Sequence, residues 1–99
     1  PNPILRFNEK FELLYNNAAS TINFLSDFKI KENKLNDRVL KCYFKKVKEN
    51  RNSERIIQTR NKRHYSLILV YVEEFNYINI YASDITNFIN QANEKEKTI

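Results

Sequence analysis

Hydrophobic and polar residues alternate in the stretch from residue 77 to residue 83. Every second residue is Ile or Ala, and these residues share one face of an extended chain: Ile78, Ile80 and Ala82. A period of two among β-branched and aromatic residues predicts a strand with one buried face. The strand is expected to stop at Asp84, because Asp84 and Thr86 carry oxygen atoms that can cap the first N–H groups of a helix. A core strand therefore leads directly into an exposed helix, a layout that suits a domain passing a signal out through its C-terminal end.

The rest of the chain predicts four more strands and two more helices. The strands cover residues 4–7, 12–16, 54–60 and 64–72, and the helices cover residues 18–25 and 35–50. The apolar stripe of the longer helix, which is expected to face the sheet, consists of Leu35, Val39, Leu40, Tyr43, Phe44 and Val47. Residues 64–72 are apolar on both faces, which predicts a central strand covered on each side. The whole order predicts an α+β domain, in which a five-stranded antiparallel sheet carries helices on one face.

Composition supports one folded domain and a glycine-free set of turns. The chain has 99 residues, of which 41% are hydrophobic and 13% aromatic, enough for a single core and against disorder. The sequence contains no Gly, so we expect Asn to form the turns with positive φ, because Asn tolerates them best after Gly. The candidates are Asn8, Asn33, Asn36, Asn50, Asn52, Asn61 and Asn76. One Cys rules out an internal disulfide and suits a reducing compartment.

Two stretches resemble the PAS family of sensory domains. The segment Tyr77-Ile78-Asn79-Ile80-Tyr81-x-x-Asp84-Ile85-Thr86 resembles that family's last strand and Asp-Ile-Thr signature. The opening Pro1-Asn2-Pro3-Ile4-Leu5-Arg6-Phe7, together with Leu14-Tyr15-Asn16-Asn17-Ala18-Ala19, resembles its first two strands and first helix. This chain has Asn8-Glu9-Lys10 and Ala82-Ser83 where the family usually has Gly.

The resemblance implies a domain organisation, a partner and a location. Residues 1–86 would form a PAS-like sensory domain with the first strand at the sheet centre, and residues 87–99 would begin a C-terminal signalling helix. Asp84 and Thr86 would relay the signal to the output domain of a bacterial histidine kinase or, next, a nucleotide cyclase. The signalling helices of the family pair, so a homodimer is expected, with apolar residues near a heptad spacing at Ile85, Phe88, Ile89, Ala92 and Ile99. The domain is expected to be cytoplasmic, in a parent protein that can be membrane-anchored.

A ligand cavity is the site that the family suggests, between the inner face of the sheet and the helices. By resemblance, its lining would be Leu5, Phe7, Val39, Tyr43, Ser66, Ile68, Ile80 and Ala82. Ser66 and Tyr43 would supply its polar contacts. The alternative is that these side chains fill a packed core without ligand.

Catalytic and cofactor chemistry finds little support in the residues. Without Gly there is no Gly-rich phosphate loop, and no metal-binding spacing or activated nucleophile appears, so this domain is not expected to be an enzyme. Cys42 lacks the motif in which PAS relatives form a flavin adduct, and is interpreted as a structural thiol. Haem-binding relatives use a His on a helix, whereas His64 begins a strand; it is interpreted as a strand-end residue or, alternatively, a ligand or partner contact. Haem and flavin are therefore disfavoured, and no cofactor is required.

Charge is unevenly distributed and provides an alternative function. From Lys29 to Arg63 the sequence has thirteen Lys and Arg against four Asp and Glu. This segment is interpreted as the solvated face of a helix, or as a surface for nucleic acid, anionic lipid or an acidic partner. A small nucleic-acid-binding domain is thus the second hypothesis, with Tyr71, Tyr77 and Tyr81 as stacking residues.

Overall fold

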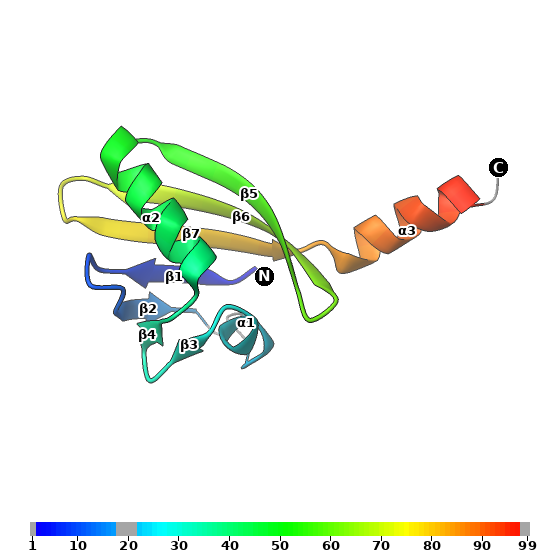
Figure 1. Cartoon of the computed structure of the whole chain (residues 1–99), viewed down its shortest axis with the longest axis horizontal. Coiled ribbons are helices and arrows are strands. Elements are labelled where there is room, and N and C mark those ends of the chain that lie inside the picture. Colours follow the sequence, from blue (N-terminus) through cyan, green and yellow to red (C-terminus); the bar gives the residue numbers. More distant parts are fainter. Residues whose placement is uncertain (1, 18–21, 98–99) are drawn as a thin grey trace.

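The last strand, β7 (Tyr77–Asp84), lies at the centre of a five-stranded antiparallel sheet (Figure 1). The computed structural model describes residues 2–17 and 22–97. The strand order is β2 (Leu13–Asn16), β1 (Ile4–Phe7), β7, β6 (Arg63–Val72) and β5 (Ser53–Arg60). The five-stranded antiparallel sheet and its accompanying helices confirm the predicted α+β class. The expectation that the first strand is central is wrong, because β7 inserts between the β1–β2 and β5–β6 hairpins and pairs with one strand of each.

The alternation predicted for β7 is confirmed by its pairing. Ile80 lies opposite Leu5 of β1 and Leu69 of β6, and all three side chains are buried on one face. Tyr81, one residue on, lies on the other face and is 41% exposed. Because successive side chains of a strand point to opposite faces, this register places the apolar set of β7 in the core.

Three helices accompany the sheet in the described residues. α1 (Ile22–Asp27) and α2 (Arg38–Asn50) cover one face, and a small hairpin of β3 (Ile30–Lys31) and β4 (Lys34–Leu35) lies between them in sequence. Residues 18–21 of the predicted first helix lie outside the described residues.

α2 begins later than its apolar pattern predicted. Leu35 belongs to β4, and Asp37 caps the helix by accepting a hydrogen bond from the backbone N–H of Leu40 at 3.0 Å. With Leu35 outside the helix, the buried stripe is Leu40, Phe44 and Val47. Tyr43 is half-buried against the core, but Val39 is 41% exposed, so its predicted place facing the sheet is wrong.

β6 was predicted to be a central strand covered on each side, but only one of its faces is fully buried. Tyr65, Leu67 and Leu69 are buried on the face that carries α1 and α2. Leu67 and Leu69 lie opposite Ala82 and Ile80 of β7, which fixes this as the core face. The intervening residues are therefore half-buried on the opposite face.

The turns use positive φ at residues other than glycine. Asn33, Asn61 and Asn76 adopt φ values of 60°, 51° and 55°, which confirms three of the predicted Asn turns. The described residues with positive φ also include Phe11, Lys29, Glu32, Arg51 and Lys62. Such residues cost more in this conformation than Gly or Asn, so several turns of the chain carry local strain.

α3 (Thr86–Lys97) begins where β7 ends and extends away from the sheet (Figure 1). Phe88 on this helix is 74% exposed, whereas Ile85 and Ile89 near its start are half-buried. Ile99, the last member of the predicted heptad pattern, lies outside the described residues. Within the described part of the chain, no helix has the length and apolar character needed to cross a bilayer.

Candidate functional site

The junction between the sheet and α3 is held by side-chain oxygens of Asp84 and Thr86. Asp84 Oδ1 accepts hydrogen bonds from the Thr86 backbone N–H at 2.9 Å and from the Thr86 hydroxyl at 2.5 Å. Asp84 therefore caps the start of α3 as its position predicted. Thr86 does more than cap, because its Oγ1 also accepts a hydrogen bond from the backbone N–H of His64 at 2.9 Å.

A second bond joins the same two elements. The backbone N–H of Ile85 donates to the carbonyl oxygen of His64 at 2.8 Å. The first turn of α3 is thus bonded to the beginning of β6 through both polar backbone atoms of His64. The His64 ring contacts the neighbouring strand β5, where its Nδ1 is 2.8 Å from the hydroxyl oxygen of Thr59, the residue opposite His64.

The neighbours of His64 in β6 bind a buried carboxylate at the end of α1. Arg63 donates to Asp27 from Nε at 2.6 Å and from Nη2 at 2.7 Å, and the Tyr65 hydroxyl donates at 2.6 Å. Asn61 adds a fourth bond from Nδ2 at 2.7 Å. Asp27 is 3% exposed, so this carboxylate is fully satisfied by protein donors in a site with little water.

These bonds shift the acidity of both acids in the cluster. The hydrogen bond from Arg63 is the main reason why the pKa of Asp27 falls from 3.8 to about 2, and burial opposes the shift. Burial, followed by the hydrogen bond to Asp27, raises the pKa of Tyr65 from 10.0 to about 12. At neutral pH Asp27 is therefore an anion and Tyr65 a neutral donor. The sequence pattern missed this cluster, although an isolated Asp between Phe24 and Phe28 was a signal that could have revealed it.

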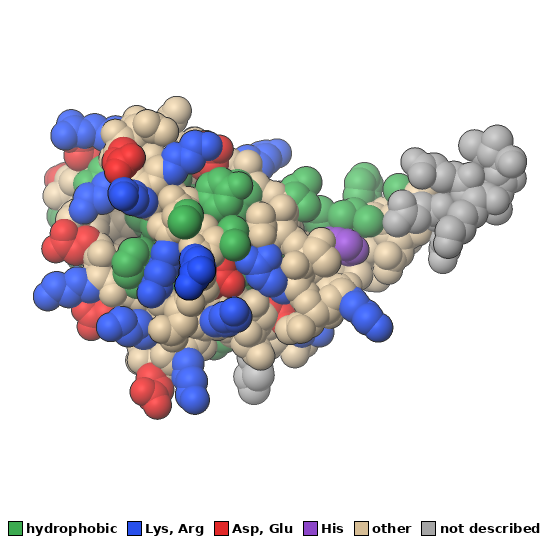
Figure 2. Space-filling model, in the orientation of Figure 1, with side chains coloured by type: hydrophobic (Ala, Val, Ile, Leu, Met, Phe, Trp, Pro, Cys, Tyr) green, Lys and Arg blue, Asp and Glu red, His purple; other side chains and the backbone are tan. Residues whose placement is uncertain are grey.

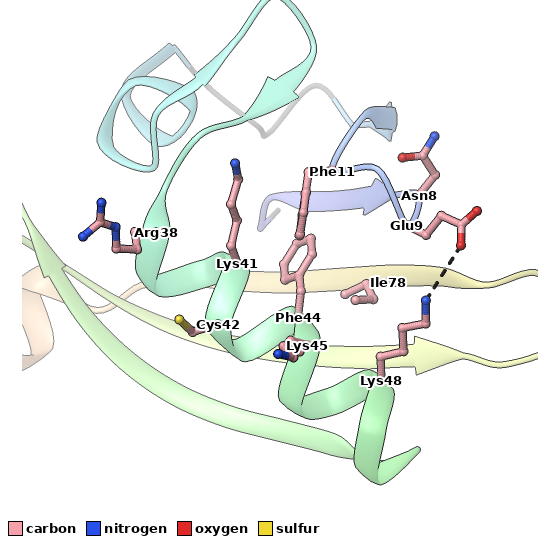
Figure 3. Close-up of a pocket in the computed structure, with 10 residues that line it drawn as sticks. All are labelled: Asn8, Glu9, Phe11, Arg38, Lys41, Cys42, Phe44, Lys45, Lys48 and Ile78. Carbon is pink, nitrogen blue, oxygen red and sulfur yellow. Dashed lines mark ion pairs between the residues drawn. The ribbon is translucent and has the colours of Figure 1, made fainter.

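A groove lies between α2 and the turn that joins β1 to β2 (Figure 3). Its volume is about 420 Å³. Phe11 points from the turn towards α2, and its ring lies 5.8 Å from that of Phe44. Buried Phe44 and Ile78 of β7 form the apolar base. The cationic residues along its α2 side are Arg38, Lys41, Lys45 and Lys48.

One end of this groove is closed by an acidic residue that ties three elements together. Glu9 in the β1–β2 turn lies 3.8 Å from Nζ of Lys48 on α2. Glu9 Oε2 also accepts a hydrogen bond from Nδ2 of Asn76, in the β6–β7 turn, at 2.7 Å. The elements that bound the groove are therefore joined at this end by exposed polar contacts.

The predicted cavity residues do not converge on one site. Leu5, Phe7, Ile80 and Ala82 are buried in the core, and Val39 is exposed, as described above. Ser66 and Ile68 were expected on the inner face, but the β6–β7 register places them on the opposite face, where they line a separate hollow with Ile4 and Tyr81. The sequence could not separate the two faces of β6, because both are apolar.

The basic segment and the tyrosines proposed for nucleic-acid stacking do not form one surface. Figure 2 shows Lys and Arg side chains on the face of the molecule that carries α2. Tyr77 and Tyr81 lie on the opposite face of the sheet, and Tyr71 packs against the core. Five of the thirteen cations between Lys29 and Arg63 are in ion pairs: Lys46, Lys48, Arg51, Arg60 and Arg63.

Metal-binding geometry and known relatives provide no further assignment. Among residues 2–17 and 22–97, no three His, Cys, Asp or Glu side chains are grouped so that they could hold a metal ion. Comparison of the chain with protein-family models gave no match, and neither did comparison with curated protein sequences. The candidate sites in the described residues are therefore the junction, the Asp27 cluster and the groove.

Proposed function

We propose that this chain is a PAS-like sensory and dimerisation module of a bacterial signal-transduction protein, with a histidine kinase as the first choice of parent. One observation carries the proposal. Three consecutive residues of β6 bind the helical layer and the exit helix together, since Arg63 and Tyr65 bond Asp27 of α1 while His64 bonds Thr86 of α3. A shift of α1 relative to the sheet is therefore transmitted to the base of α3.

The proposed mechanism uses α3 as the output element. The start of α3 is bonded to β6 through Thr86 and Ile85. The direction of the helix is therefore set by the position of the end of the sheet. A stimulus that displaces α1 changes the angle or rotation of α3. A small change at a packed contact can in this way bias an output domain with two discrete states.

Dimerisation would occur through α3 of two copies. Phe88 presents a largely exposed aromatic ring, and Ile85 and Ile89 lie one turn apart beside it. Residues at such three- and four-residue spacings share one side of a helix, so a two-fold pair of α3 helices would bury the ring. In such a pair, a change in the angle of α3 would change the relative orientation of the two subunits.

The test is a fusion of this domain, through α3, to the dimerisation and catalytic domains of a histidine kinase. Asp27→Asn and Thr86→Val each break one side of the connection. Both are expected to change the autophosphorylation rate in the same direction by at least about threefold, which corresponds to at least about 0.6 kcal/mol. The matched control is Thr59→Val, which removes a hydroxyl from the His64 ring but leaves α3 bonded. Unchanged rates in both test variants, with folding verified by circular dichroism, would show that the connection does not relay a signal.

A further inference from the structure

The groove beside α2 has an excess of positive charge that its own residues do not neutralise. Arg38, Lys41 and Lys45 follow one another at spacings of three and four residues, so they are neighbours on the helix surface. No acidic side chain in the described residues forms an ion pair with any of the three. Glu9, the acidic residue of the lining, is already bonded to Lys48 and Asn76. The repulsion among these cations would be relieved by an anion.

An apolar surface lies directly beside these cations. Nζ of Lys41 is 5.0 Å from the centre of the Phe11 ring, and Phe11 in turn lies against Phe44. Figure 3 shows Lys41 on α2 between Arg38 and Phe11. A ligand that fills the groove would meet carbon on one side and ammonium groups on the other.

We propose that this groove binds a small amphiphilic anion, with its carboxylate or phosphate group at Lys41 and Lys45 and its apolar body on Phe11 and Phe44. A volume of about 420 Å³ lies within the range of small-molecule sites, which combine a mostly apolar lining with a few charged groups. The proposal that an anion binds in the groove depends only on the residues that line the groove. The further statement that this anion is the signal rests on the proposed sensory function.

The groove differs from the core cavity expected from the sequence. Its lining shares no residue with that predicted set, whose inner-face members Leu5, Phe7 and Ile80 are fully buried behind it. A ligand in the groove would instead bridge α2 and the β1–β2 turn. It could therefore move these two elements relative to each other without opening the core.

The experiment is an amide NMR titration of the ¹⁵N-labelled domain with soluble eight-carbon compounds. Octanoate and octyl phosphate supply the anionic head with an apolar body, octanol removes the charge, octylammonium reverses it, and acetate removes the body. We expect shifts confined to residues around Phe11 and Lys45 with octanoate or octyl phosphate. Octanol and octylammonium lack the anionic head that the lysines would bind, and acetate lacks the apolar body, so each is expected to bind at least about tenfold more weakly. A preference between the two anions identifies the head group.

Two matched variants test the residues. Lys41→Gln with Lys45→Gln is expected to weaken octanoate binding about tenfold. Arg55→Gln with Lys62→Gln removes the same charge from exposed positions outside the groove and is expected to change binding less than twofold. Equal binding of octanol and octanoate, equal loss in both double variants, or shifts located elsewhere would overturn the proposal.

Three further outcomes separate this inference from its alternatives. A short single-stranded oligonucleotide that shifts the groove residues at lower concentration than octanoate would reassign the surface to nucleic acid and overturn the proposal. Octanoate binding that leaves the kinase fusion unchanged, while Asp27→Asn alters it, would keep the site and reject the anion as the signal. Octanoate binding with a fusion insensitive to Asp27→Asn and Thr86→Val would keep the site and reject the relay.

Discussion

Asp27 and Thr86 do not bond each other, yet both bond the same short segment of β6, residues 63–65. Asp27 accepts from the side chains of Arg63 and Tyr65, and Thr86 accepts from the backbone of His64 between them. The two contacts differ in strength, because the first is a buried charged cluster and the second a single hydroxyl bond. The beginning of β6 is therefore fixed firmly to α1 and more weakly to α3.

This relationship predicts energetic coupling between two residues that are not in contact. In a double-mutant cycle of Asp27→Asn and Thr86→Val, measured by urea unfolding, we expect a coupling free energy of at least about 0.5 kcal/mol. The reason is that loss of Asp27 frees the backbone of residues 63–65, which Thr86 needs in place. The control cycle pairs Asp27→Asn with Ser53→Ala at the far end of β5 and should be additive.

Asp27 should make stability depend on acidic pH. Its pKa is about 2 in the folded protein against 3.8 when unfolded, so its contribution is fully present above pH 4 and is lost as the pH falls from about 4 to about 2. The shift corresponds to about 2 kcal/mol. Urea unfolding of wild type and Asp27→Asn should differ by about 3 kcal/mol at pH 7, because Arg63 loses its buried partner.

The difference should shrink at pH 2.5, where wild-type Asp27 is partly protonated. The matched control is Glu74→Gln, which removes an exposed negative charge and is expected to change stability by less than about 0.5 kcal/mol. A difference between wild type and Asp27→Asn that stays constant from pH 7 to pH 2.5 would contradict the assigned pKa.

Tyr65 should affect the opposite end of the pH range. Its pKa is about 12 when folded and 10.0 when unfolded, so it contributes stability fully below pH 10 and loses that contribution as the pH rises towards 12. Tyr65→Phe is expected to cost about 1–2 kcal/mol at pH 7, because the hydrogen bond to a charged partner is lost. Thermal unfolding between pH 7 and pH 11 measures both effects. If the Tyr65→Phe variant lost stability at alkaline pH as steeply as wild type, the ionisation of Tyr65 would not be the cause of that loss.

The β5–β6 turn offers a stabilising substitution. Asn61 and Lys62 both have positive φ between the paired residues Arg60 and Arg63, the geometry that favours Asn-Gly in a two-residue hairpin. Lys62→Gly is therefore expected to raise the free energy of unfolding by about 0.5–1 kcal/mol. Lys62→Ala, which removes the same charge and keeps a Cβ atom, should give no gain in the same denaturation experiment.

The sequence was informative where one face of an element was clearly polar. β7 alternates Ile with polar or aromatic residues, and its extent, core face and capping Asp84 could all be read from that pattern. β6 is apolar at every position from Tyr65 to Val72 except Ser66, so only the register with β7 decides which half enters the core. Ser66 and Ile68 were assigned to the wrong face for this reason.

Long-range polar contacts were beyond the reach of local patterns. Asp27 and Arg63 are 36 residues apart. The position of Asp27 between Phe24 and Phe28 suggests a buried carboxylate, but it does not identify Arg63 as the partner. The groove likewise depends on Phe11, which adopts a φ of 64° in a turn, a conformation unusual for an aromatic residue. Its lysines were visible only as the polar side of a helix until the turn was placed beside them.

The central position of β7 gives the domain a mechanical property. α3 continues from the end of β7 (Figure 1), so tension applied along α3 acts on a strand that is paired on both sides, with β1 and with β6. Such a load shears two ladders of hydrogen bonds at once, whereas an edge strand would peel away bond by bond. The attachment of Ile85 and Thr86 to His64 shares the force with β6 at its first residues. A pulling force on α3 is therefore distributed over β1, β7 and β6 together.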